Sequence, residues 1–160
     1  MRKITPVRVV LLSAALIVGV IGGAVGVSAV RTGTEGCTPG FWKNHLDAWE
    51  EYAPTDLVGD VFNIPAAYSD LADDTLLEAL SYPDDEQGGN AAENLLRTAV
   101  AAILNAASED VGYPYRRFGD PGNIIPTVNN LLAGGDEQAM EDFKDLLDAA
   151  NNLGAEGFCD

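Results

Sequence analysis

The segment around position 45 contains residue types that acid–base chemistry uses. Phe41-Trp42-Lys43-Asn44-His45 places the only histidine of the chain beside a tryptophan, a lysine and an amide. An imidazole can act as a general base when a carboxylate orients it, so one hypothesis is a hydrolase that uses His45 and an Asp or Glu. The sequence lacks a nucleophile elbow, a zinc-protease helix, a Walker loop and a dinucleotide fingerprint. We therefore expect no catalytic residue and favour His45 as a hydrogen-bonded residue on an apolar helix face.

A second hypothesis uses aromatic and basic side chains as a binding surface. Exposed indole and phenol rings can stack on sugars or peptides, and guanidinium groups bind carboxylates. The candidates for such binding are Trp42, His45, Trp49, Tyr115, Arg116 and Arg117. The structural alternative is that the two arginines tie their segment to acids on helices while Tyr113 and Phe118 fill the core.

A metal site has one candidate, the acidic run Asp84-Asp85-Glu86, which lies in a loop-forming segment. Carboxylate oxygens are calcium ligands, but the register of the twelve-residue calcium loop fails because its closing Glu would fall on Leu95. Two cysteines and one histidine exclude Cys/His zinc clusters, iron–sulfur centres and c-type haem attachment. We expect no cofactor, with calcium at the acidic run as the alternative.

The charge of the chain excludes some partners. It has 25 Asp and Glu against nine Lys and Arg, and three of these bases precede residue 9. The other six bases and the 25 acids therefore leave the rest of the chain at −19. Such a surface is repelled by nucleic acid and by anionic membranes. It suits molar salt, where the Debye length falls to about 3 Å, so we expect a salt-adapted protein. The alternative is an ordinary acidic soluble protein.

The first thirty residues have the pattern of an export signal. A basic start is followed by an uncharged run over residues 9–30, and Val27-Ser28-Ala29 has small residues where signal peptidase requires them. We expect residues 1–29 to be a signal peptide cleaved after Ala29. The alternative is an uncleaved membrane anchor, because about 20 apolar residues can span a bilayer.

Export gives the two cysteines a meaning, because disulfides form in oxidising compartments. Cys37 lies near the start of the exported chain and Cys159 next to its end. We expect one disulfide between them, and the alternative is two free thiols.

The elements that must position these residues are helical. Apolar residues recur with a helical period, and alternating β-branched runs are nearly absent. The strongest signal follows Asn90 and Glu93, which have capping-box spacing ahead of a stripe of apolar residues. The sequence predicts a single all-α domain over residues 37–160, after a linker at 30–36. It is a compact bundle of five or six short helices with long loops, preceded by a signal peptide or an N-terminal anchor helix. The expected helices are 38–53, 55–62, 74–80, 90–107, 123–133 and 136–154.

The stretch Gly36-Cys37-Thr38-Pro39-Gly40-Phe41-Trp42-Lys43-Asn44-His45 resembles the opening motif of a family of exported prokaryotic domains. These begin Cys-Thr-Pro-Gly-(Tyr or Phe)-Trp-Lys-Asn-His. The likeness continues through residues 74–80, 95–107, 113–114 and 146–154, which covers most of the exported chain. In one departure from the pattern, Ala155-Glu156-Gly157-Phe158 separate the Asn-Asn-x-Gly sequence from the closing Cys. The resemblance implies a secreted or surface-attached module, often part of a larger envelope protein, with no established catalytic activity.

Together these observations favour a non-catalytic extracellular or cell-surface module with a structural or adhesive role. We expect it to contact other envelope components or copies of itself, and to meet a membrane only through residues 9–30 if they are uncleaved. A sugar- or peptide-binding module and a hydrolase using His45 are the alternatives.

Overall fold

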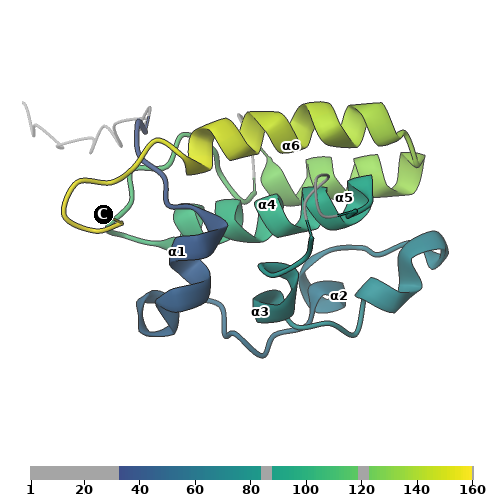
Figure 1. Ribbon diagram of the computed structural model, residues 1–160, viewed down its shortest axis with the longest axis horizontal. Helices are drawn as coiled ribbons and strands as arrows, with labels where there is room; N and C mark the ends of the chain where they lie inside the picture. The colour runs from purple at the N-terminus through teal and green to yellow at the C-terminus, as the bar shows by residue number, and fades with distance from the viewer. Residues whose placement is uncertain (1–32, 84–87, 119–122, 160) are drawn as a thin grey trace, which may run out of the picture.

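The computed structural model describes residues 33–83, 88–118 and 123–159. The described part is helical, which confirms the all-α class (Figure 1). Its α-helices and 3₁₀ segments (η) are α1 Pro39–Asn44, η1 Leu46–Ala48, α2 Val58–Val61, η2 Ala66–Leu71, α3 Leu76–Ala79, α4 Ala91–Ala107, α5 Ile124–Gly134 and α6 Glu137–Asn151.

Helix α4 is the central element, as its alanine-rich sequence predicts. It begins at the expected capping box: the Asn90 side chain accepts hydrogen bonds from the backbone N–H groups of Ala92 and Glu93, each at 3.0 Å. Thirteen of its 17 residues are buried, so it has neighbours on nearly every side. Figure 1 shows α6 along one side of it and α1 and α3 along the other.

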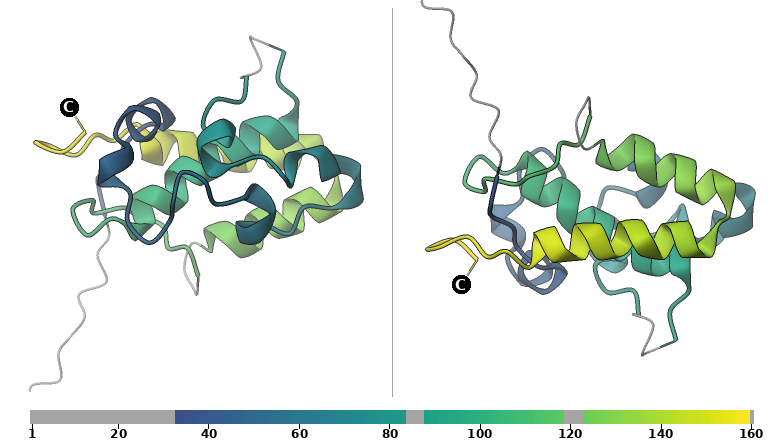
Figure 2. Two further views of the ribbon diagram at one scale, coloured as in Figure 1. Left: turned by 90° about the horizontal axis from the view of Figure 1, so that it is seen from below. Right: turned by 90° about the horizontal axis from the view of Figure 1, so that it is seen from above.

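The C-terminal helices α5 and α6 form an antiparallel pair (Figure 2, right). Pro126 lies in the first turn of α5, where a missing N–H costs nothing. The C-cap is Gly135, one residue later than expected, because its φ of 67° is a left-handed conformation that glycine adopts without strain. Asp136 caps α6 by accepting a hydrogen bond from the Ala139 N–H at 3.2 Å. Helix α6 ends at Asn151, before the predicted stop at Gly154.

The single helix expected over residues 38–53 is wrong. Helix α1 ends at Asn44, η1 follows, and Trp49 has an extended backbone. If the helix continued, the Trp42 carbonyl would accept the backbone N–H of the residue four positions later. It accepts the Trp49 indole N–H instead, at 2.9 Å. The predicted apolar stripe is therefore broken, and Leu46 is 42% exposed.

The middle helices are shorter than their sequence pattern. Helices α2 and α3 cover only the centres of the expected ranges 55–62 and 74–80. Thr75 and Glu78 form a reciprocal capping box, so α3 begins at Leu76, two residues after the predicted start at 74. Segment η2, Ala66–Leu71, has no helical period in its sequence and was not expected.

The two ends of the described chain lie side by side at one end of the bundle. Gly36 and Gly154 exchange backbone hydrogen bonds of 3.0 and 2.9 Å in an antiparallel bridge. Glu35 donates its N–H to the Gly112 carbonyl and accepts the Gly112 N–H on its carboxylate at 2.6 Å. Residues 33–36, which the sequence suggested as linker, are therefore part of the folded body.

We predict that Gly36→Ala destabilises the protein by about 1–3 kcal/mol, the range for forcing atoms into a packed site. A Cβ at Gly36 would lie 2.1 Å from the Ala150 carbonyl oxygen, and moving the Gly36 backbone away would disturb its bridge to Gly154. Urea unfolding measures the change.

The matched control is Gly40→Ala in the same motif, where the nearest atom would be 3.5 Å away. Because alanine favours helix, this variant should be as stable as the parent or up to about 1 kcal/mol more stable. Equal stability of the Gly36→Ala variant and the parent would contradict the packing described for this end.

Candidate functional site

The expected disulfide between Cys37 and Cys159 is present, with an S–S distance of 2.13 Å and Cα atoms 5.5 Å apart. It joins Cys37, two residues before the start of α1, to the last described residue, and neither cysteine remains as a free thiol. A disulfide is consistent with an oxidising, extracytoplasmic compartment.

A buried amide holds the opening motif against α4. The side-chain oxygen of Asn105 accepts the backbone N–H of Cys37 at 2.7 Å and the indole N–H of Trp42 at 3.1 Å. Its amide nitrogen donates to the Cys37 carbonyl at 2.8 Å and to the Asn151 side-chain oxygen at 2.9 Å. Both lone pairs and both N–H groups of Asn105 are used, so this residue has nothing left to offer a ligand.

The same network continues to α6 and to the segment after α4. The Asn151 oxygen also accepts the Tyr113 hydroxyl at 2.7 Å, and its nitrogen donates to the Thr98 carbonyl at 3.0 Å. Asn105 and Asn151 are 0% exposed, and burial raises the pKa of the Tyr113 hydroxyl. Neither asparagine is among the residues that the sequence predicts to be functional. The available signal was a polar residue among the mostly apolar buried residues of each helix.

Trp42 is part of the core. It is 0% exposed, and the rings of Phe41 and Phe158 pack against it at centroid distances of 5.2 and 6.1 Å. The hypothesis of an exposed Trp42 face is wrong, because the indole ring has no free surface for a sugar. Trp49 is half-buried and uses its N–H on the Trp42 carbonyl.

His45 caps the end of α1 at the surface. Its Nδ1 lies 2.9 Å from the Phe41 carbonyl oxygen, and since a carbonyl only accepts, Nδ1 is the donor. Its ring stacks on the Phe41 ring with centroids 4.2 Å apart. Within the described ranges no carboxylate forms a hydrogen bond with His45, so the pair that a hydrolase would need is not assembled there. The predicted apolar environment of His45 is also wrong, because the side chain is exposed.

In the basic segment 115–118, Arg117 ties the segment to another loop, an ion pair that we call the clamp, whereas Arg116 and Phe118 lie at the surface. Arg117 forms an ion pair with Glu51 at 2.6 Å, and the hydrogen bond from Arg117 lowers the pKa of that carboxyl. Glu51 is in a loop, so the clamp joins two loops rather than a loop and a helix. Phe118 is 63% exposed and does not fill the core, whereas Tyr113 does. Arg116 is exposed, and Tyr115 is half-buried against Tyr113.

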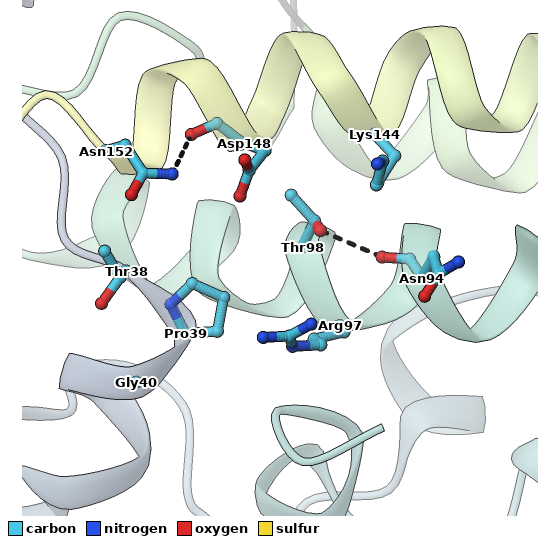
Figure 3. Close-up of a pocket in the computed structure, with 9 residues that line it drawn as sticks. All are labelled: Thr38, Pro39, Gly40, Asn94, Arg97, Thr98, Lys144, Asp148 and Asn152. Carbon is cyan, nitrogen blue, oxygen red and sulfur yellow. Dashed lines mark hydrogen bonds between the residues drawn. The ribbon is translucent and has the colours of Figure 1, made fainter. Parts of the chain in front are cut away.

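A polar cleft of about 430 Å³ lies between α1, α4 and α6 (Figure 3). Lys144 on its wall makes ion pairs with Asp145 at 2.8 Å and Glu141 at 3.3 Å, and the contact with Asp145 raises the pKa of its amine. The cleft includes residues of the opening motif, for which the sequence predicts only a role in starting a helix. The lining residues are Thr38, Pro39, Gly40, Asn94, Arg97, Thr98, Lys144, Asp148 and Asn152.

The calcium candidates Asp84, Asp85 and Glu86 lie outside the described residues. Over residues 33–83, 88–118 and 123–159, no three His, Cys, Asp or Glu side chains gather as a metal site would require. In those same ranges, none of the helices combines the length and the apolar character needed to cross a bilayer.

Comparison with known proteins gives no match to this chain among protein-family models, curated proteins or solved structures.

Proposed function

We propose that this protein is a non-catalytic, extracytoplasmic structural module that works by contact with other envelope components or with copies of itself. The observation that carries this proposal is the use of the opening motif. Cys37 is in a disulfide, Trp42 is buried on Asn105, and His45 caps a helix. The residues whose types suggested chemistry are thus engaged in holding the fold together, which supports a structural role.

The signal pattern and the disulfide together support an extracytoplasmic compartment. Cleavage after Ala29 would leave three residues before Gly33, whose backbone packs against Gly112. Three extended residues span about 10 Å. An uncleaved anchor would therefore hold the end of the bundle that carries Gly36 and Gly154 close to the membrane surface.

The test is the state of the native protein in its own cells. We expect it in the envelope or medium fraction, with Val30 as its first residue, a mass two protons below the reduced value, and an assembly larger than one chain. Full-length, reduced protein in the cell interior would overturn the proposal. An unprocessed but oxidised chain in the membrane fraction would favour the anchor over the cleaved signal.

Salt adaptation is part of the same proposal, and we predict that the Tm rises steadily as NaCl or KCl is raised into the molar range. The 19 net negative charges repel one another at low salt, and ions screen that repulsion when the Debye length falls to about 3 Å near 1 M. Calorimetry on the intact protein measures it. A Tm that does not change with salt concentration would contradict the salt proposal. A sharp rise in Tm on adding micromolar calcium at constant ionic strength would favour a metal site instead.

A further inference from the structure

The cleft of Figure 3 is built from three elements that are distant in the sequence. Thr38, Pro39 and Gly40 supply its α1 wall, Asn94, Arg97 and Thr98 its α4 wall, and Lys144, Asp148 and Asn152 its α6 wall. Its volume of about 430 Å³ falls within the usual range of about 300–1,000 Å³ for small-molecule sites.

The chemistry of the lining favours a ligand that both donates and accepts hydrogen bonds. Arg97 and Lys144 can only donate, and the Asp148 carboxylate can only accept. No hydrogen bond from another described residue reaches that carboxylate, and the α6 side chains of Asp148 and Asn152 point from their helix toward α1 and α4 (Figure 3). The lining contains no aromatic ring and no aliphatic side chain other than the proline ring, so an apolar ligand has little to contact.

The charges of the lining residues restrict the chemical class of the ligand further. An anion would meet the Asp148 carboxylate in the cleft. A cation would meet the Arg97 guanidinium, whereas the Lys144 ammonium is already paired with Asp145 and Glu141. A neutral molecule with several hydroxyl groups avoids both repulsions, because one hydroxyl can donate to the Asp148 carboxylate and another can accept from the Arg97 guanidinium.

The walls of the cleft are held in place before any ligand arrives. Thr38 caps α1 by accepting the Phe41 N–H at 3.1 Å, next to the Cys37–Cys159 disulfide. The Asn152 amide is oriented by a 2.8 Å hydrogen bond to the Asp148 backbone carbonyl, drawn in Figure 3. Such preorganisation reduces the entropy lost on binding.

From this geometry we infer that the cleft between α1, α4 and α6 is a binding site for one unit of a neutral sugar. The inference rests on the proposed function only for the source of that sugar, which would be a glycan of the envelope. Binding to the purified protein is independent of location, so the two proposals can fail separately.

The experiment is a titration of the oxidised, ¹⁵N-labelled protein in molar salt, followed by amide chemical shifts. The neutral probes are D-glucose, D-galactose, D-mannose and N-acetyl-D-glucosamine, each up to about 100 mM, which detects Kd values into the millimolar range. Glucuronate and glucosamine are the charged counterparts of the first probe. We expect at least one neutral sugar to shift the amides of the lining residues, and its acidic and basic relatives to bind several-fold more weakly.

The variant Asp148→Asn should weaken the binding at least tenfold, because it replaces the charged acceptor with an uncharged one of the same shape. The matched control Asp142→Asn makes the same change on the exposed face of α6, outside the cleft, and should leave binding unchanged. The inference is overturned if none of the four neutral sugars changes the amide chemical shifts, or if the shifted amides lie away from the cleft. It is also overturned if a charged relative binds more tightly, or if Asp148→Asn and Asp142→Asn change the binding equally.

Discussion

Replacing Asn105 by alanine is expected to lower the free energy of unfolding by about 3–5 kcal/mol. The change leaves four buried groups without their partner: the N–H and C=O of Cys37, the Trp42 indole N–H and one lone pair of Asn151. Each buried group that loses its partner costs about 1–3 kcal/mol, and the effects overlap because one cavity serves all four. Urea unfolding at fixed molar salt, with the disulfide intact, gives the value.

The control for this substitution is Asn130→Ala, which removes an exposed amide from α5. Exposed substitutions of this kind usually stay within about 0.5 kcal/mol. The variant Asn105→Asp adds a second comparison, because it keeps an acceptor for Cys37 and Trp42 but cannot donate. If Asn105→Ala cost less than about 1 kcal/mol, the amide would not be the tie between the opening motif and α4.

Removing the disulfide with Cys37→Ala and Cys159→Ala together is expected to cost about 4–5 kcal/mol. The two cysteines are separated by 122 residues, and closing a loop of that length restricts the unfolded chain by this amount in the chain-entropy model. The backbone of Cys37 stays bonded to Asn105 in the variant, so the helical circular dichroism and the buried environment of Trp42 should persist. Thermal and urea unfolding measure the loss.

A reductant provides the control for the double variant. It should destabilise the parent to the level of the variant and leave the variant itself unchanged. If the reductant does not change the stability of the parent and neither cysteine reacts with the alkylating agent, the disulfide has not been reduced. The treatment with reductant must then be repeated in denaturant. Alkylation of both thiols without reductant would contradict the disulfide.

The three long helices could be predicted because their determinants are local. The capping box of Asn90 and Glu93, the proline in the first turn of α5 and the cap at Asp136 act within one turn of the chain. Apolar periodicity adds the buried face of each helix. Expectations based on these signals agree with the structure to within a few residues.

Helix α1 shows where such local signals fail. Its apolar spacing continues to Tyr52, but the Trp42 carbonyl bonds to the Trp49 indole instead of to the next turn. The same spacing suggested that Trp42 and His45 share a face, whereas one is buried and the other exposed. The spacing of apolar residues gives the period of a helix. It does not show where a distant side chain will take the place of a backbone hydrogen bond of that helix.

The helical class, the positions of the long helices, the excess of acids and the pairing of the two cysteines could be predicted from the sequence. Three features emerge only from packing: Asn105 and Asn151 hold the opening motif, Arg117 pairs with Glu51, and a polar cleft forms between α1, α4 and α6. The physical reason is the range of the interactions. Caps and periodicity act over three or four residues, whereas a buried amide finds partners 46 and 68 residues away only after packing has brought them together.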